Sequence, residues 1–378
     1  MAATPESGFL LIADLTGYTA YVAGGEIEHA PVIAGDLLET IVGRLEPPFR
    51  LDKFEGDAAF LHVEDGRAEG SLLLDAIDAS YLAFRRRLRS IEQATTCECN
   101  SCRRAPRLDL KYFVHHGLFI RGRIAGRDEL AGSAVIVVHR LLKGGTATAA
   151  HGPDGRAAGF AVYTAEAVRA LGIDPLALEL AQATETIEHL GAVDTFTQDL
   201  ETRWQSETGQ QRLTLDSGEP LFDIEIAVPA EPATVWPYLT SPALRPTWEG
   251  PIRIAEQAPD GRRGVGTTSQ CVTGALATLE EIVDWQPFDH AGYRLAVADV
   301  GPIVATFDLA PLPSGTQVRL RWQGLGNTVP EAATVAAIEL EKRSGLGRLA
   351  AMLAPQRPVQ EVTHDPLLVP GDHRQATP

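Results

Sequence analysis

The chain has 378 residues, of which 44% are hydrophobic, and this length predicts two domains rather than one. It carries 33 basic and 50 acidic residues, a net charge of −17, which argues against nucleic acid or an anionic membrane as a principal partner. No apolar run approaches about twenty residues, and the first residues lack the basic and apolar segments of a signal peptide, so the sequence predicts a cytoplasmic protein without a membrane span.

Two apolar runs of strand length stand out in the first half, Phe9–Thr19 and Phe49–Val63. The first carries Asp14 shortly before Gly17, and the second carries Asp57 directly after Gly56. A charged side chain at the end of a buried strand is costly unless it is paired or binds a cation. Two such carboxylates on adjacent strands therefore predict a site for a hard divalent cation, Mg2+ or Mn2+.

The turn after the first strand predicts a phosphate-binding segment. Gly17, Tyr18 and Thr19 offer backbone N–H groups and hydroxyls at a helix start, where phosphate oxygens bind readily. The next helix is predicted over Glu26–Leu45, because its apolar residues recur with a helical period, and Pro47 ends it.

The order of the remaining elements in the first half predicts a β-α-β-β-α-β arrangement. After a hairpin over Leu51–Val63 we expect a helix over Ser71–Ile91, a strand over Leu108–Ile120 that is interrupted at His115–Gly117, a hairpin or loop over Arg121–Leu130, a helix over Gly132–Lys143 and a strand over Phe160–Thr164. This order fits the ferredoxin-like plan of an α+β domain.

Three of the four cysteines lie in one short segment, at Cys97, Cys99 and Cys102. In a cytosolic chain this spacing favours metal or redox chemistry over disulfides. The three thiolates are suited to one Zn2+, with a fourth ligand from His115, His116 or a second subunit. A reduced structural loop and a redox switch remain as alternatives.

A polar stretch near residues 195–218 predicts a domain boundary, with a first domain over 1–200, a linker over 201–217 and a second domain over 218–355. Leu221–Val228 alternates as a half-buried strand does, and a helix, several further strands and a long helix over Glu331–Leu353 follow. This order is typical of a helix-grip fold. Residues 356–378, rich in proline and polar types, predict a disordered tail.

Several motifs of the first half together resemble a cyclase-like domain family of unknown function, DUF2652. The residues that carry this resemblance are Asp14–Thr19, Gly25–His29, Asp36–Glu39, Glu55–Ala58, Cys97–Cys102, Leu110–Gly117 and His139–Lys143. Asp14–Thr19 and Lys53–Asp57 also resemble the metal-binding core of class III adenylate and guanylate cyclases.

The cyclase resemblance implies roles for individual residues. Asp14 and Asp57 would hold the metal ions, Lys53 would contact adenine, and Arg140 would stabilise the charge that develops on phosphorus in a catalytic step. Sites of this class are usually shared between two subunits, so the resemblance also implies a homodimer.

Two departures from the cyclase pattern put turnover in doubt. Ile136 stands where cyclases carry an asparagine that holds the ribose, and Glu129 is the nearest match to the aspartate that partners the adenine-contacting lysine. Without the asparagine that holds the ribose, the reacting groups should be oriented less well. Correct orientation lowers a reaction barrier by several kcal/mol, and by up to about 7–11 kcal/mol in well-oriented systems.

The second half resembles the SRPBCC superfamily, which includes START and polyketide-cyclase-like domains. The matching segments are Ile226–Trp236, Gly264–Thr267 and Trp285–Phe288. This resemblance implies a helix-grip fold with a cavity for a small hydrophobic ligand, and it assigns no chemistry.

The sequence therefore predicts a nucleotidyl-cyclase-like domain that binds a purine nucleoside triphosphate with a divalent metal, fused to a hydrophobic-ligand-binding domain. Formation of a cyclic nucleotide, and so classification as an enzyme, is left open. One alternative is a catalytically degenerate cyclase-fold sensor controlled by the ligand of the second domain. Another places the chemistry in the second cavity, as in a cyclase or dehydratase of aromatic polyketides.

Overall fold

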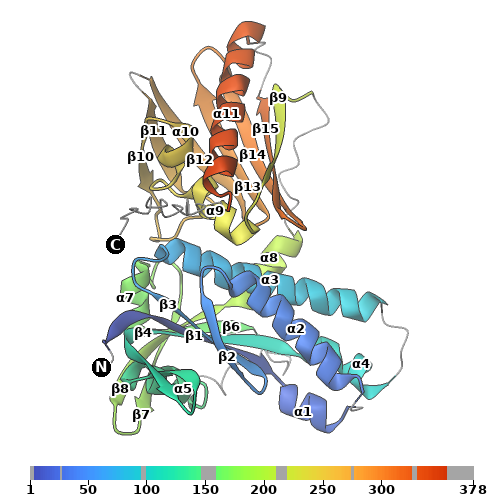
Figure 1. Cartoon of the computed structure of the whole chain (residues 1–378), viewed down its shortest axis with the longest axis vertical. Helices are drawn as coiled ribbons and strands as arrows, with labels where there is room; N and C mark the ends of the chain where they lie inside the picture. The colour runs from blue at the N-terminus through green and yellow to red at the C-terminus, as the bar shows by residue number, and fades with distance from the viewer. Residues whose placement is uncertain are drawn as a thin grey trace, which may run out of the picture.

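The computed structural model describes residues 4–25, 28–94, 99–145, 159–209, 219–273, 276–325 and 330–355, which form two α+β domains, one above the other in Figure 1. Within these ranges no helix is both long and apolar enough to cross a membrane. The cytoplasmic location stays a prediction. The predicted disordered tail over 356–378 lies outside the described residues.

The first domain is built on one sheet with helices on both faces. Its strands are β1 (Glu6–Thr16), β2 (Arg50–Glu55), β3 (Ala58–Glu64), β4 (Asp109–Ile124), β5 (Arg127–Ala131), β6 (Phe160–Thr164), β7 (Ala181–Ile187) and β8 (Gly191–Asp199). Its helices are α1 (Tyr18–Ala23), α2 (Ala30–Leu45), α3 (Gly70–Ala94), α4 (Asn100–Arg104), α5 (Ser133–Leu141), α7 (Ala165–Leu171) and α8 (Leu200–Gly209), with a 3-10 turn over Ala105–Arg107.

The strand order β2-β3-β1-β4-β6-β8-β7 contains the predicted ferredoxin-like core. The first four strands lie in the order β4-β1-β3-β2 with every neighbouring pair antiparallel, as a β-α-β-β-α-β unit requires. β6 then adds in parallel to β4, and the hairpin of β7 and β8 completes the sheet. The α+β prediction is confirmed for this domain.

β1 is the centre of this sheet, because it pairs with β3 on one side and β4 on the other. Phe9, Leu11 and Ala13 point towards α2 and α3, while Leu10 and Ile12 point towards α5. The run is apolar without alternation because both faces of the strand are covered.

Several details differ from the sequence predictions, and among them α2 begins at Ala30 rather than at Glu26. β4 runs without a break through His115–Gly117, which pair with β1 along their whole length. The hairpin of β7 and β8 was not predicted. Helix α8 occupies the first part of the predicted linker, with Leu200 and Trp204 buried.

The second domain is an antiparallel sheet of seven strands in the order β10-β11-β12-β13-β14-β15-β9. Its strands are β9 (Phe222–Val228), β10 (Ile252–Gln257), β11 (Thr268–Thr273), β12 (Leu276–Gln286), β13 (His290–Val297), β14 (Gly301–Leu312) and β15 (Gly315–Gly324). Its helices are α9 (Pro232–Thr240), α10 (Arg245–Glu249) and α11 (Ala332–Met352). The long α11 lies across one face of the sheet, which is the predicted helix-grip arrangement (Figure 1).

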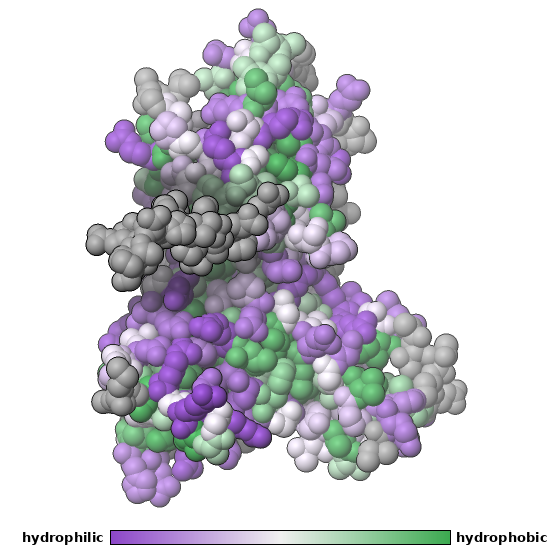
Figure 2. Space-filling view, in the orientation of Figure 1, coloured by the Kyte–Doolittle hydropathy of each residue, from purple (hydrophilic) through white to green (hydrophobic). Residues whose placement is uncertain are grey.

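The visible face of both domains is mostly hydrophilic (Figure 2). Hydrophobic residues gather there in small patches, one of them over the region of α2 and β2. The two domains meet along α3, which lies directly below α9 in Figure 1.

A buried polar cluster joins α3 to the second domain. The Asp75 carboxylate accepts hydrogen bonds from the indole N–H groups of Trp236 and Trp285, each at 3.0 Å. Arg262 of the second domain lies 3.7 Å from Asp75 and 2.5 Å from Asp78. Because these side chains are almost fully buried, the domains share an interior and are more than tethered units.

Asp75 makes the stability of this interface depend on pH. Burial raises the pKa of Asp75 to about 6 from its ordinary 3.8, although Arg262 and the two indoles partly oppose the rise. The folded state therefore binds this proton more tightly than the unfolded state does.

We expect the free energy of unfolding of the wild type, relative to Asp75→Asn, to fall by on the order of 2–3 kcal/mol as the pH rises from 4 to 7. The contribution is fully present below the unfolded pKa and is lost as pH rises through the folded pKa. Urea unfolding of both proteins across this range measures it. A difference that stays constant with pH would contradict the protonation equilibrium assigned to Asp75.

Candidate functional site

The carboxylates of Asp14 and Asp57 lie at the same end of the sheet. Asp14 is the residue of β1 that pairs with Ala58, the first residue of β3, and Asp57 immediately precedes it. The backbone N–H of Leu15 also donates to the carbonyl of Asp57 over 3.2 Å. The structure therefore brings together the two residues that the sequence predicts as metal ligands.

Asp14 is nearly buried, with 9% of its surface exposed. Burial raises its pKa to about 6, the cation of Lys111 on β4 lowers it, and the negative charge of Asp57 raises it again. Lys111 Nζ lies 3.3 Å from the Asp14 carboxylate. One lysine thus only partly compensates a pair of carboxylates, and a divalent cation would stabilise their charged forms.

The chain turns sharply after this strand. Gly17 has a φ of +87°, a value that favours glycine, and its carbonyl accepts from the N–H of Tyr21 over 2.9 Å. Tyr18 and Thr19 form the first turn of α1, where backbone N–H groups have no partner within the helix. Among the described residues, the buried hydroxyl of Thr16 also has no hydrogen-bond partner.

Lys53 lies in a chain of charged side chains beside this site. Its Nζ is 2.6 Å from Glu129 of β5 and 3.4 Å from Glu55. Glu55 in turn lies 2.9 Å from Nε2 of His139 on α5. The hydrogen bond to Glu129 raises the pKa of Lys53, so the lysine is held charged with a carboxylate at its side.

Arg140 does not point into the sheet. On α5, Ala134, Val137 and Val138 are buried against the sheet. Arg140 is exposed, and so is Ile136, with 51% of its surface exposed. Since these two residues are four positions apart, they lie on the same outward face of the helix. Within one chain, Arg140 is therefore not gathered with Asp14 and Asp57.

The cysteine segment is partly described. Cys99 and Cys102 lie beside His29, and Cys97 falls outside the described residues. His115 and His116 are not in this cluster: Nδ1 of His115 lies 2.9 Å from the Thr164 hydroxyl, and Nε2 of His116 lies 2.9 Å from Asp65.

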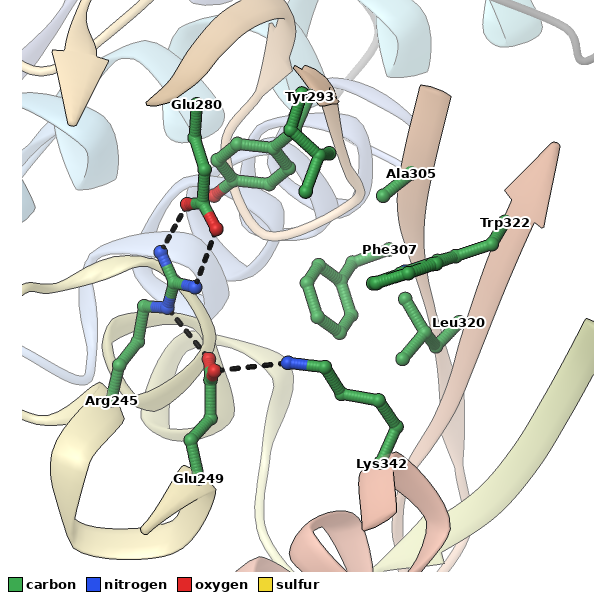
Figure 3. A pocket seen from close by; sticks show the side chains of 10 residues that line it. Arg245, Glu249, Glu280, Tyr293, Ala305, Phe307, Leu320, Trp322 and Lys342 are labelled. Carbon is green, nitrogen blue, oxygen red and sulfur yellow. Dashed lines mark hydrogen bonds and ion pairs between the residues drawn. The ribbon is translucent and has the colours of Figure 1, made fainter. Parts of the chain in front are cut away.

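The second domain contains a small cavity between its sheet and α11, of about 30 Å3 (Figure 3). Its apolar end is formed by Phe307, Leu320 and Trp322, and Tyr293 lies at its side. A cavity of this volume has room for about one or two water molecules. The described residues thus leave this cavity smaller than the hydrophobic ligand that the sequence predicts.

Charged residues close the other end of this cavity. Arg245 bridges Glu249 and Glu280, with nitrogen-to-oxygen distances of 2.7 Å to each, and Lys342 of α11 lies 3.1 Å from Glu249 (Figure 3). Arg245 and Lys342 hold the pKa of the buried Glu249 at about 2, against the effect of burial. This network ties α11 to α10 by one ion pair.

A larger hollow, of about 560 Å3, opens at the boundary between the domains. Pro47, Pro48 and Leu72 line it from the first domain, and Trp236 and Tyr238 line it from the second. Both domains therefore contribute apolar residues to the walls of this hollow.

Two residues of these sites did not emerge from the sequence. Lys111 becomes the partner of Asp14 only through the pairing of β1 with β4, although a lysine inside the apolar run Leu110–Val114 was a signal. His29 is a lone histidine beside a helix, and nothing local to it indicates its proximity to the cysteines.

Family models match both halves of the chain. Residues 34–150 match the model described as "Protein of unknown function (DUF2652)", and residues 220–354 match "Polyketide cyclase / dehydrase and lipid transport". Both resemblances predicted from the sequence are thereby confirmed.

Similar proteins cover only parts of the chain. The uncharacterized protein Rv2561/Rv2562 of Mycobacterium tuberculosis is 35% identical over 107 residues, which are 28% of this chain and 50% of that protein. This chain thus spans half the length of the curated relative that it matches.

Solved structures of nucleotide cyclases are also similar. A bacterial light-regulated adenylyl cyclase has a TM-score of 0.40 and 13% identity over 52% of this chain and 51% of its own. The guanylyl cyclase Cya2 has a TM-score of 0.38 and 14% identity over 52% of this chain and 93% of its own. Likeness at this level does not extend to activity or substrate.

Proposed function

We propose that the first domain binds a purine nucleoside triphosphate together with Mg2+ or Mn2+. The observation that carries this proposal is the pair of carboxylates at the end of β1, where Asp14 is buried beside Asp57 and, among the described residues, pairs with Lys111 alone. Such a pair is costly to keep charged without a cation.

The residues present fit a hard divalent ion. Asp14 and Asp57 supply carboxylate oxygens, the ligands that Mg2+ prefers, and the Thr16 hydroxyl on the same strand has no other partner among the described residues. A bound ion would neutralise charge on a polyphosphate. The N–H groups of Tyr18 and Thr19 would hold its phosphate oxygens.

Lys53 and Glu129 form a donor and acceptor pair suited to a purine. They belong to β2 and β5, which are not neighbours in the sheet, and their contact of 2.6 Å holds both groups at one place. A glutamate in place of the aspartate of cyclases thus keeps the pairing with lysine.

Lys53→Ala is expected to weaken ATP binding by about 10- to 100-fold, because a hydrogen bond to a charged group contributes roughly 1.5–3 kcal/mol. Titration calorimetry with ATP and Mn2+ measures the effect. Arg123→Ala, which removes an exposed arginine of the same domain, is the control and should leave affinity unchanged. Equal affinity in Lys53→Ala and the wild type would reject the purine role of the pair.

We infer that two chains are needed to complete the site. Arg140 is on an exposed face of α5 and away from the carboxylates of its own chain, which is the position expected of a residue offered to a second subunit. In such a homodimer Arg140 would contact the phosphates held by the partner.

A degenerate sensor is the second candidate, and Ile136 favours it. This residue is 51% exposed on the same face as Arg140 and cannot donate a hydrogen bond to a ribose. Without that contact the domain would bind nucleotide and transmit its presence without turnover.

Incubating the purified full chain with each nucleoside triphosphate and Mn2+, and following products by mass spectrometry, separates the two candidates. A cyclic nucleotide with released pyrophosphate would establish an enzyme. Nucleotide binding without product over many hours would establish the sensor, and absence of metal-dependent binding would reject both.

For the second domain we propose binding of a small hydrophobic ligand, which is supported by the match to a lipid-transport model. A cavity of about 30 Å3 is smaller than such a ligand, so we propose that α11 moves when a larger ligand enters. Such a movement would break the ion pair of Lys342 with Glu249 and the hydrogen bonds that Arg348 of α11 donates to the carbonyls of Trp248 and Glu249.

A further inference from the structure

Three side chains that can bind a metal lie close together beside α2 and α4. Because they are far apart in the sequence, no local motif predicts that they are close in space. His29 immediately precedes α2, Cys99 immediately precedes α4, and Cys102 lies within α4. One ligand atom from each residue lies within 4.8 Å of the others. About seventy residues separate the histidine from the cysteines.

The spacing of these atoms matches a tetrahedral metal site. Nδ1 of His29 lies 3.2 Å from Sγ of Cys99 and 3.7 Å from Sγ of Cys102. Zinc bonds of about 2.3 Å to sulfur and 2.0–2.1 Å to nitrogen place such ligand atoms about 3.6 Å apart at a tetrahedral angle. The observed distances bracket that value.

The surroundings also favour thiolate ligands. Sγ of Cys99 accepts a hydrogen bond from the backbone N–H of Cys102 over 3.4 Å, and this N–H would stabilise a negative sulfur. Cys99 and Cys102 are neither fully buried nor fully exposed, so metal can reach them. The Cys-x-x-Cys spacing is frequent in zinc sites.

We propose that His29, Cys99 and Cys102 bind one Zn2+ ion, with the fourth position filled by a further ligand. Two thiolates and an imidazole select zinc over Mg2+, which requires oxygen ligands. The metal would fasten the start of α2 to α4.

The test is the metal content of the full chain purified without added metal. Elemental analysis is expected to give about one zinc per chain, and His29→Ala and Cys102→Ser should each lower it more than fivefold, since both remove a ligand. Cys271→Ser is the matched control, because Cys271 is a buried free cysteine of the second domain, and should leave zinc unchanged.

Cobalt substitution keeps the test decisive if a variant fails to fold. Wild-type protein stripped of zinc and loaded with Co2+ should show thiolate-to-metal absorption and visible bands of tetrahedral cobalt. Wild-type zinc below about one per two chains, together with no such absorption, would overturn the proposal. Unchanged zinc in folded His29→Ala and Cys102→Ser would also overturn it.

Discussion

Asp14→Asn and Asp57→Asn are each expected to abolish metal-dependent nucleotide binding while the fold remains intact. Each change removes a ligand charge but keeps the size of the side chain. Changing a residue that merely orients a metal ligand costs about 10- to 100-fold in affinity, so loss of a ligand should cost more than about 100-fold. Titration calorimetry of Mn2+ and ATP together measures it.

Asp128→Asn is the control for both variants. Its side chain belongs to the same domain and is 92% exposed, so its loss should change neither binding nor fold. Circular dichroism establishes that all three variants are folded. If both Asp14→Asn and Asp57→Asn bind the nucleotide as tightly as the wild type does, the carboxylate pair is not the metal site.

The sequence predicts those parts of the fold whose signal is local. The apolar run of β1, the helical periods of α2 and α3, and the alternation of β9 are each visible within one element. The hairpin of β7 and β8 was missed because β7 is mostly exposed and carries alanine, glutamine, glutamate and threonine. A strand at the edge of a sheet has few apolar positions to reveal it.

The same distinction, between residues with a local sequence signal and residues brought together only by the fold, applies to the candidate site. Asp14 and Asp57 could be predicted because each stands where an apolar run meets a glycine turn. The pairing of Asp14 with Lys111 depends on the register of β1 against β4. The approach of His29 to Cys99 depends on how α2 packs near α4, and no pattern within either segment specifies that packing.

Arg262→Met is expected to destabilise the protein by up to about 3–5 kcal/mol, because removing one partner of a buried ion pair leaves the buried carboxylates less compensated. Asp78 keeps only the ion pair with Arg203 at 3.2 Å among the described residues, and Asp75 keeps its two indole donors. Arg262 reaches across the domain boundary to Asp75 and Asp78, whose side chains are 2% and 1% exposed. Methionine fills a similar length but carries no charge. Urea unfolding followed by tryptophan fluorescence measures the loss, and Trp236 and Trp285 report it from the boundary itself.

Arg319→Met is the matched control. Arg319 pairs with Asp223 within the second domain, but its side chain is 42% exposed, and exposed pairs contribute at most about 1 kcal/mol. The two variants therefore remove the same group from a buried and from an exposed pair. Equal losses in both would show that burial at the boundary has no energetic consequence.

The double variant Asp75→Asn with Arg262→Met separates the charge from the packing. If the loss in Arg262→Met comes from an uncompensated Asp75 carboxylate, the added asparagine should recover part of it, and the two changes should not be additive. Recovery would make the cluster an electrostatic connection between the domains.

Any ligand of the second domain that shifts Trp236 or Trp285 would then change the environment of α3. Because α3 packs on α2, the change would also reach the first domain. A ligand effect on nucleotide affinity should disappear in the double variant, and by reciprocity so should the effect of nucleotide on ligand affinity.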